Sequence, residues 1–308
     1  MDHHDGTTPP TPPDNLGWPN VFGASIFVLL AAYISHALGT RLEIPLIISG
    51  VRCALQLTLM GLVLDDVLRV DNGCVITIIT VALVLLGAYE TVHHRAKQTI
   101  QGLLPLMIAI LLLSNGVMSI LCAGFTLNES PPWKPVTFIP VMGMLLGSSM
   151  GSVAMAISLC VESVLIHAPI IETKLSFGAS RYEAVKVAAL LTIRTAMLPQ
   201  LTQLSVMGMI NIPGMLAGQI QAGTSAKQAV LYQVCIMFAM TASNGIGVLL
   251  TVCACMRLLV DANHVIRKDR IIQSHSTFYQ VIIRGLNDMV QWCAGCGNRR
   301  RRRHYHQL

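Results

Sequence analysis

Charge is scarce in this chain of 308 residues, because only 12% of them are Asp, Glu, Lys or Arg, whereas 53% are hydrophobic. Soluble domains carry roughly 25% charged residues. The deficit excludes an ordinary soluble domain and indicates a chain that lies largely within a membrane. The formal net charge of +6 follows from where the cations lie relative to that membrane and gives no reason to expect a nucleic-acid partner.

Sequence signatures of catalysis are also missing. The phosphate-binding pattern G-x-x-x-x-G-K-[S/T] does not occur, so the chain is not expected to hydrolyse ATP by itself. Gly147–Gly151 matches the G-x-S-x-G pattern of serine hydrolases. That pattern needs a strand–turn–helix in a soluble sheet, whereas this match lies in an expected membrane helix. The sequence therefore predicts no enzyme.

Disulfide and metal-binding signatures are weak. Most of the nine cysteines lie in or at apolar runs, where a thiol packs as a small hydrophobe; they include Cys53, Cys122, Cys160, Cys235, Cys253 and Cys255. The 16 methionines are better explained as gap-fillers than as ligands of a soft metal. The apolar runs hold no cluster of carboxylates, which argues against a stable, high-affinity metal site and leaves any metal ligands unknown.

Long apolar runs dominate what is present, and a run of about 20 residues suffices for a helix to cross a bilayer. Seven such runs occur: Val21–Gly39, Ile44–Leu64, Cys74–Tyr89, Leu103–Phe125, Val136–Val161, Thr195–Ala226 and Gln228–Met256. They predict an all-α, polytopic membrane protein with about seven transmembrane helices. Residues 1–20 are expected to be a disordered Pro-rich start, 21–260 the transmembrane domain and 261–308 a basic cytosolic tail.

Cation placement predicts the orientation, since Lys and Arg are enriched in cytosolic loops. With the N-terminus outside, the outer loops hold only Arg69, Lys134 and Lys227, which leaves 18 of the 21 cations on the cytosolic side or, for Arg52, in the second run. We therefore expect the N-terminus outside and the C-terminus in the cytosol. No basic segment precedes the first run, so no cleavable signal peptide is expected.

A polar segment separates the fifth and sixth runs. Gly178 suits the left-handed residue that ends a helix. Ser180, followed three residues later by Glu183, forms the pattern of a capping box. The pattern predicts a helix that ends near Ser176, a turn at Gly178 and a new helix after Ser180, on the cytosolic side. An ordinary, well-capped loop is the alternative interpretation.

The sixth run contains helix-breaking residues at Asn211–Gly214. Broken helices at membrane depth usually line a cavity or act as hinges. The sequence predicts a transport pathway or hinge that includes Asn211, Pro213, Gly214, Gly218 and Gln219. A kink that serves packing is the alternative.

Two other patterns lie inside the apolar runs. Arg52 and Gln56 are four residues apart and share a helix face. A charged residue at membrane depth tends to face a polar cavity, although Arg52 also lies close enough to the cytosolic interface to snorkel. Gly143, Gly147 and Gly151 form a stripe that another helix can approach closely.

The tail combines an amphipathic stretch, a cysteine pair for which a metal or redox role and acylation are alternatives, and a basic run. Phe278–Trp292 has the spacing of a helix that lies on a membrane surface, and Cys293 and Cys296 follow it. Arg299–Arg303 would contact anionic lipid, unless the tail is simply solvated.

The segment Lys174–Glu183 resembles the coupling loop of ATP-binding-cassette permeases. From Ile34 to Met256 the chain is similar to the permease family that includes the bacterial iron-export permease FetB and the plant aluminium-tolerance membrane proteins. The matching residues include Ser35 and His36, Arg52 with Gln56 and Gly61, Gly143 with Gly147, Lys174–Ser180, Arg194, Pro199, Gly208, Pro213–Met215, Gly218, Ala222, Gly223, Ala229, Tyr232 and Gln233.

This resemblance implies the transmembrane subunit of a transporter, present as a homodimer, with a separate ATPase subunit that binds ATP and Mg²⁺. Lys174, Gly178, Ala179, Ser180, Arg181 and Glu183 would couple to that ATPase. Arg52, Gln56, Tyr232 and Gln233 would join the transport pathway. Family members imply export of metal ions such as iron, or metal tolerance, with transport of a nucleotide sugar such as UDP-glucose as the alternative.

Two other classes of membrane protein compete with this interpretation. A seven-helix receptor is disfavoured because no Asp-Arg-Tyr ends the third run and no Asn-Pro-x-x-Tyr occurs in the seventh. An ATPase-independent secondary transporter or channel explains the broken sixth run but gives the capped polar segment no role.

Overall fold

The computed structural model describes residues 17–40, 42–68, 73–96, 98–126, 133–261 and 265–273. Seven helices in these ranges are long and apolar enough to cross a membrane, which confirms the predicted all-α, multi-pass class. The predictions made for residues 1–16 and for residues 274–308, including Phe278–Trp292, Cys293, Cys296 and Arg299–Arg303, lie outside the described residues.

The chain divides into two compact parts, with the boundary at Asp65 and Asp66. The first part contains α1 (Trp18–Ala37) and most of α2 (Glu43–Leu68). A short turn joins these helices, in which the Ser35 hydroxyl bonds the Thr40 hydroxyl at 2.7 Å and accepts from the Leu42 N–H at 3.1 Å. Most described side chains of α1 and α2 are exposed and apolar, as expected for surfaces that face lipid or another helix.

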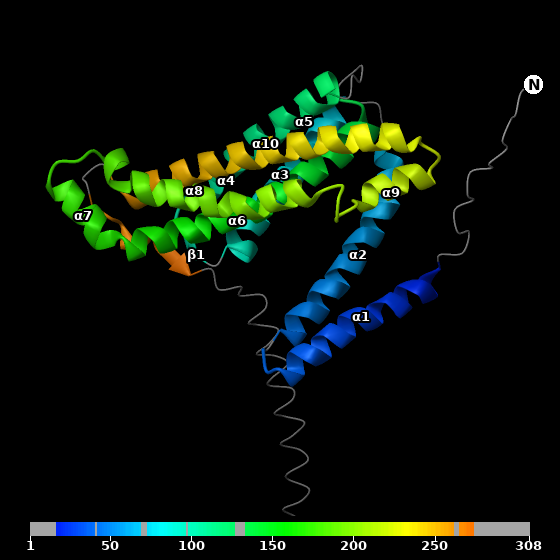
Figure 1. The fold of residues 1–308 in the computed structure, drawn as a ribbon, viewed down its shortest axis with the longest axis horizontal. Helices are drawn as coiled ribbons and strands as arrows, with labels where there is room; N and C mark the ends of the chain where they lie inside the picture. The colour runs from blue at the N-terminus through cyan, green and yellow to red at the C-terminus, as the bar shows by residue number, and fades with distance from the viewer. Residues whose placement is uncertain are drawn as a thin grey trace, which may run out of the picture. The chain divides into compact units, whose positions relative to one another are not determined.

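The second part holds the remaining elements. They are α3 (Gly73–Glu90), η1 (Thr91–Arg95), β1 (Gln98–Ile100), α4 (Leu103–Leu111), η2 (Leu112–Gly116), α5 (Val117–Leu121), η3 (Cys122–Thr126), α6 (Pro135–Ile166), α7 (Ala168–Ser176), α8 (Arg181–Val206), α9 (Gly214–Gln221), α10 (Ala226–Leu259), η4 (Lys268–Arg270) and β2 (Ile271–Gln273). The long helices α6, α8 and α10 run side by side, with α7 at one end and α9 at the other (Figure 1). We call these ends the α7 end and the α9 end.

The core of the second part contains large apolar side chains of α4 and α6. Leu103, Met107, Leu145 and Ile157 are fully buried. Gly87 lets α3 approach α6 closely, because a Cβ at this position would lie 3.2 Å from Leu146. Close packing of this kind stabilises helix association in a membrane, where the hydrophobic effect between helices is weak.

Six of the seven predicted apolar runs coincide with the candidate spans to within a few residues. The sixth does not. The spanning helix is α8, Arg181–Val206, which begins in the polar segment and ends before the Pro-Gly pair. The following α9 has only eight residues, or roughly 12 Å at 1.5 Å per residue, which is too short to cross a membrane. The boundaries Thr195–Ala226 were therefore wrong, because an uncharged run is not the same as a continuous helix.

The fourth span is irregular. Between α4 and α5 the backbone adopts the π-helical form at η2, and it does so again at η3. Such π segments insert an extra residue per turn and often occur at functional sites. Here η2 directs Ser114 and Asn115 into the core, where both are buried.

A two-stranded antiparallel sheet closes the α7 end. Strand β1 follows η1, and β2 follows the last helix, with Thr99 opposite Ile272. The connections after η1, after α6 and after α10 therefore all lie at the α7 end. This is the grouping that the cation pattern predicts for one side of a membrane.

Candidate functional site

The turn between α7 and α8 has the geometry predicted from its sequence. Gly178 has a φ of +84°. The Gly178 N–H donates to Leu175 O and the Ala179 N–H donates to Lys174 O, both at 3.1 Å. These two bonds form a Schellman motif, which satisfies carbonyls at the end of α7.

Helix α8 begins with a complete capping box. The Ser180 hydroxyl accepts from the Glu183 N–H at 3.4 Å, and Glu183 Oε2 accepts from the Ser180 N–H at 2.9 Å. The carboxylate also accepts from the Ser180 hydroxyl at 2.7 Å. The two helices are thus joined by a short turn whose backbone donors and acceptors are satisfied internally.

The tip of the turn between α7 and α8 is exposed, whereas the helix ends that carry it are buried in the core. Phe177 is 87% exposed and Tyr182 is 62% exposed. Behind them, Leu175 of α7 and Ala184 and Val185 of α8 are buried in the main core. An exposed aromatic pair on a rigid, anchored turn is suited to contact a partner protein. The sequence analysis quoted Phe177 for the resemblance but missed it as a site residue.

Polar contacts tie the start of α8 to the end of α10. Arg257 donates to the Tyr182 hydroxyl from Nε at 3.1 Å and from Nη2 at 2.9 Å. A shallow hollow beside this pair is lined by Arg181, Tyr182, Val185, Met256, Arg257 and Val260. The turn between α7 and α8 therefore has α10 as a neighbour, which the sequence did not predict.

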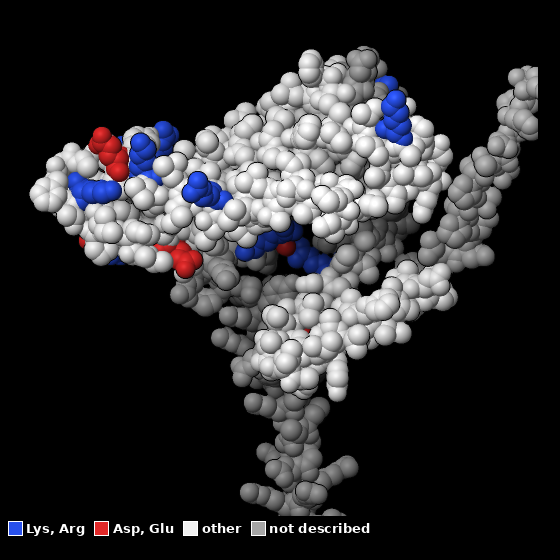
Figure 2. Space-filling view, in the orientation of Figure 1, with Lys and Arg blue, Asp and Glu red and all other residues white. Residues whose placement is uncertain are grey.

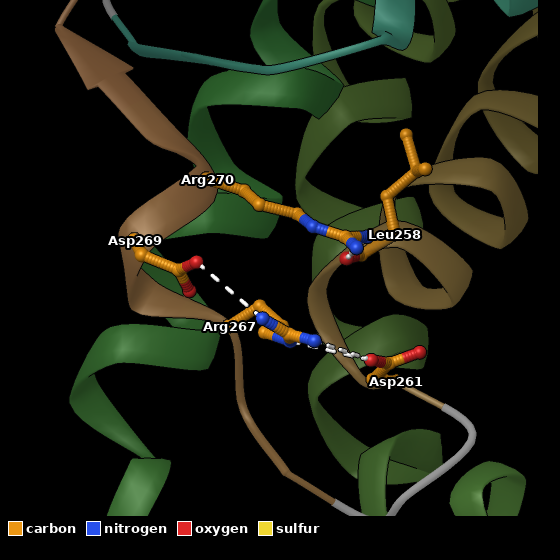
Figure 3. Close-up of polar contacts among 5 residues, drawn as sticks. All are labelled: Leu258, Asp261, Arg267, Asp269 and Arg270. Atoms are coloured by element: carbon orange, nitrogen blue, oxygen red, sulfur yellow. Dashed lines mark hydrogen bonds and ion pairs between the residues drawn. The ribbon is translucent and has the colours of Figure 1, made fainter.

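The segment after α10 folds back on the α7 end (Figure 3). Arg267 donates to Asp261 at 3.0 and 3.2 Å and also pairs with Asp269 at 3.6 Å. Hydrogen bonding to Asp261 raises the pKa of Arg267, so its guanidinium stays charged. Arg270 donates to the Leu258 carbonyl at 3.3 Å, which satisfies one of the free carbonyls at the end of α10.

The same segment also reaches α7, because Lys268 Nζ lies 3.6 Å from Glu172 Oε1. Figure 2 shows charged side chains of both signs gathered at the α7 end. Ion pairs this exposed contribute little stability each. Their concentration at one end nevertheless gives that end a polar surface suited to water and to a protein partner.

The predicted pathway residues Asn211, Pro213, Gly214, Gly218 and Gln219 lie at the α9 end. Gly208 has a φ of +85°, and its N–H donates to the Asn211 carbonyl at 3.0 Å. Pro213 caps α9, on which Gly214, Gly218 and Gln219 lie. The structure brings these residues together in a turn and a short helix beside α10.

Tyr232 and Gln233 lie near the start of α10. Tyr232 packs with Met215 of α9 around a small apolar cluster that includes Ile236. Gln233 is buried, and its Oε1 has no hydrogen-bond partner among the described residues. The two residues are therefore close to the α9 turn. Arg52 and Gln56 are exposed on α2, in the other part of the chain.

The glycine stripe on α6 faces outward. Gly143, Gly147 and Gly151 are all exposed. A Cβ added at Gly143 or Gly147 would meet no described atom within 4 Å, and at Gly151 it would meet only Arg95, at 3.9 Å. Among the described helices of the same part of the chain, none fills this stripe.

A buried polar network escaped the sequence analysis. Asn244 of α10 donates to Gln200 Oε1 of α8 and to Ser148 Oγ of α6, both at 2.8 Å. Ser243, the preceding residue, donates to Asn115 Oδ1 at 2.8 Å. These residues are polar interruptions of uncharged runs, so their presence was visible. Their pairing was not, because it joins residues far apart in the chain.

No three His, Cys, Asp or Glu side chains lie close enough to hold a metal ion among the residues described. A rigid, exposed turn at the α7 end is connected through α8 to the broken segment at the α9 end.

A family model described as "Uncharacterised protein family (UPF0014)" matches residues 18–260. The chain belongs to this family. The UPF0014 match covers all seven spans, and the predicted resemblance to the family of FetB and the plant aluminium proteins is confirmed. This chain is a multi-pass membrane protein.

Several UPF0014 relatives are similar over most of their length. The UPF0014 membrane protein YjkA of Bacillus subtilis is 30% identical over 71% of this chain and 85% of its own. The probable iron export permease protein FetB of Escherichia coli is 26% identical over 78% and 91%, respectively. Protein ALUMINUM SENSITIVE 3 of Arabidopsis thaliana is 27% identical over 70% and 77%. No solved structure matches this UPF0014 chain.

Proposed function

We propose that this chain is the membrane-spanning subunit of a transporter of the ATP-binding-cassette type, with ATP and Mg²⁺ bound by a separate ATPase subunit. The observation that carries the proposal is the doubly capped turn Gly178–Glu183, which is exposed at its tip and anchored in the core at its base. A lever that transmits force must be stiff, and a turn with satisfied caps at both helices is stiff.

The orientation follows from the same proposal. The α7 end lies in the cytosol, where ATP is available, and the N-terminus lies outside. The polar surface at the α7 end and the grouping of three predicted cytosolic connections there support this orientation.

Metal-ion export, with iron as the first candidate, is the proposed transport activity. The name of the relative FetB, a probable iron export permease, supports it. Among the described residues, no cluster of metal-binding side chains occurs. The proposal is therefore that a transported metal ion makes transient, weak contacts along its path and does not occupy a stable, high-affinity site. We further propose that two copies of the chain assemble, because the outward-facing stripe Gly143–Gly151 is open to a second helix.

The proposal is tested by affinity capture of the detergent-solubilised protein from its native membranes. We expect an ATPase subunit to be captured with the wild type and lost with Arg181→Glu or Phe177→Ala. Both positions are exposed, so neither substitution disturbs the core. Loss of a hot-spot residue at a protein interface costs about 2 kcal/mol or more, which corresponds to at least roughly 30-fold weaker binding.

Lys227→Glu is the matched control. It reverses one exposed positive charge, as Arg181→Glu does, but it lies at the start of α10 near the α9 end. Its ATPase capture should equal that of the wild type. Failure of the wild type to capture an ATPase overturns the proposal and favours an ATPase-independent transporter or channel, for which ion flux through the protein alone would be measured. With an ATPase in hand, iron and UDP-glucose would be compared as substrates in proteoliposomes.

A further inference from the structure

Three long helices are joined by side-chain hydrogen bonds about halfway along α10. Asn244 donates to Gln200 and Ser148, Ser148 donates to Gln200 Oε1 at 3.3 Å, and Gln200 Nε2 donates to Thr241 at 3.4 Å. Gln200 is 4% exposed and Asn244 is fully buried. Hydrogen bonds between membrane helices stabilise their association, so this network fixes α8 to both α6 and α10 at one level.

Immediately before this attachment, the backbone of α8 is weakened. Pro199 lies inside the helix, and because proline has no N–H it cannot donate to the carbonyl of Thr195. Prolines inside helices are frequent sites of bending. The bendable position and the fixed position are therefore adjacent residues, Pro199 and Gln200.

The two arms of α8 differ in how they are held. The arm from Arg181 to Leu198 contacts the core through Ala184, Val185, Ala188 and Ala196, and the partly buried Ile193 and Met197 pack against the same core. Three of the four buried hydrophobic side chains are alanines, which interdigitate little with their neighbours. On the same arm, Thr192 is 2% exposed, and its Oγ1 has no hydrogen-bond partner among the described residues. A buried hydroxyl without a partner is unfavourable, so no hydrogen bond from Thr192 to a described residue holds this arm in its present position.

We propose that Gln200 is the positioning residue that fixes the pivot of α8, and that the arm Arg181–Leu198 swings about Pro199 when the ATPase binds ATP. The proposal rests on the function proposed above. The long arm spans about 27 Å at 1.5 Å per residue and begins at the turn Gly178–Glu183, which is proposed to bind the ATPase. The short arm, Gln200–Val206, stays attached to α6 and α10.

The test measures distances between paired spin labels in the complex of the full chain with the captured ATPase, with and without ATP and Mg²⁺. One pair, Leu190 and Leu249, reports the long arm against α10. The other, Leu201 and Phe238, reports the short arm against the same helix. All four side chains are at least half exposed, so the labels do not disturb the core.

We expect ATP to change the Leu190–Leu249 distance by about 5 Å, on the scale of one helical turn, and to leave the Leu201–Phe238 distance unchanged. The Gln200→Leu substitution leaves the turn Gly178–Glu183 intact, so ATPase capture should be retained. In this variant, ATP should now change the Leu201–Phe238 distance as well. Exchange of the two amides, Gln200→Asn with Asn244→Gln, should restore the wild-type pattern, because it rebuilds a hydrogen bond of the same overall length.

Different failures identify different errors. No ATPase captured by the wild type defeats the proposed function. Two outcomes overturn the pivot alone while the wild type still captures the ATPase. In one, ATP changes both label-pair distances of the wild type equally; in the other, the Gln200→Leu protein shows the same distance changes as the wild type. Pro199→Ala provides a second variant, since it restores the missing backbone donor without touching the network, and it should reduce the ATP-driven change at Leu190–Leu249.

Discussion

The hydroxyl of Tyr182 accepts two hydrogen bonds from Arg257, at 3.1 and 2.9 Å. The first turn of α8 is thereby attached to the last turn of α10, although 75 residues separate them in the chain. Because both side chains are exposed, the contact restrains the position of the turn Gly178–Glu183 and adds little to the stability of the fold.

Tyr182→Phe should make the start of α8 more mobile without unfolding the protein. Removal of one hydroxyl loses roughly 0.5–1.5 kcal/mol of hydrogen bonding, which would be seen as faster amide exchange at the start of α8. Exchange in α6 should not change. Equal acceleration in both helices would mean that the contact supports the whole bundle.

Ser180→Ala should weaken the N-terminus of α8 by about 1 kcal/mol, because the alanine side chain cannot accept the Glu183 N–H. Amide exchange in the first turn of α8 would rise by roughly fivefold. Glu183→Gln is the control, since a glutamine at this position also completes a capping box. The interpretation fails if Ser180→Ala exchanges no faster than Glu183→Gln.

Gly178→Ala should destabilise the turn by about 1–2 kcal/mol, because its φ of +84° places an L-residue in the left-handed region. A lower thermal unfolding midpoint and weaker ATPase capture are expected together. Gly147→Ala serves as the comparison, since Gly147 has space for a Cβ and no positive φ. Equal midpoints for the two variants would contradict the assigned geometry.

Gly147→Leu should separate two copies of the chain while leaving each copy folded. Within its own part of the chain, no described atom lies near the missing Cβ of Gly147, so a larger side chain obstructs only a helix from outside that part. Cross-linking in membranes would show loss of the dimer, and the thermal midpoint of the monomer would be retained. Persistence of the dimer would place the contact between copies elsewhere.

Asn115→Ala should destabilise the protein by roughly 1–3 kcal/mol, because it leaves the buried Ser243 hydroxyl without its acceptor. A double-mutant cycle with Ser243→Ala would isolate the pair, with a coupling energy near 0.6 kcal/mol. A coupling energy of zero would show that the hydrogen bond itself contributes nothing.

Most of the spans and the turn Gly178–Glu183 were predictable, because the sequence patterns that specify them are local. An uncharged run reports membrane depth, and Gly178, Ser180 and Glu183 specify their own conformation through caps a few residues apart. The sixth span was misplaced because Glu183, Lys186 and Arg194 lie in the helix although they interrupt the uncharged run. The helix ends where Gly208 and Pro213 interrupt its backbone, whereas the positions of charged residues indicate only which parts of the chain lie in water.

The polar network and the π segments were not predictable for a different reason. Asn115 pairs with a residue 128 positions away, and Gln200 with one 44 positions away. Such pairings are decided by how the helices pack, which a single sequence does not encode locally. The π form at η2 likewise leaves no distinctive residue pattern, yet it directs Asn115 towards Ser243.

The pairing of β1 with β2 also sets an order of assembly. Gln98–Ile100 leaves the ribosome well before Ile271–Gln273, by roughly 10–30 s at usual rates of synthesis. During that interval, β1 is an unpaired edge, exposed to chaperones and to mispairing with other chains. The α7 end is therefore completed only after the last helix has been made, and a nascent chain that stops short of β2 contains all seven candidate spans but lacks the finished sheet of that end.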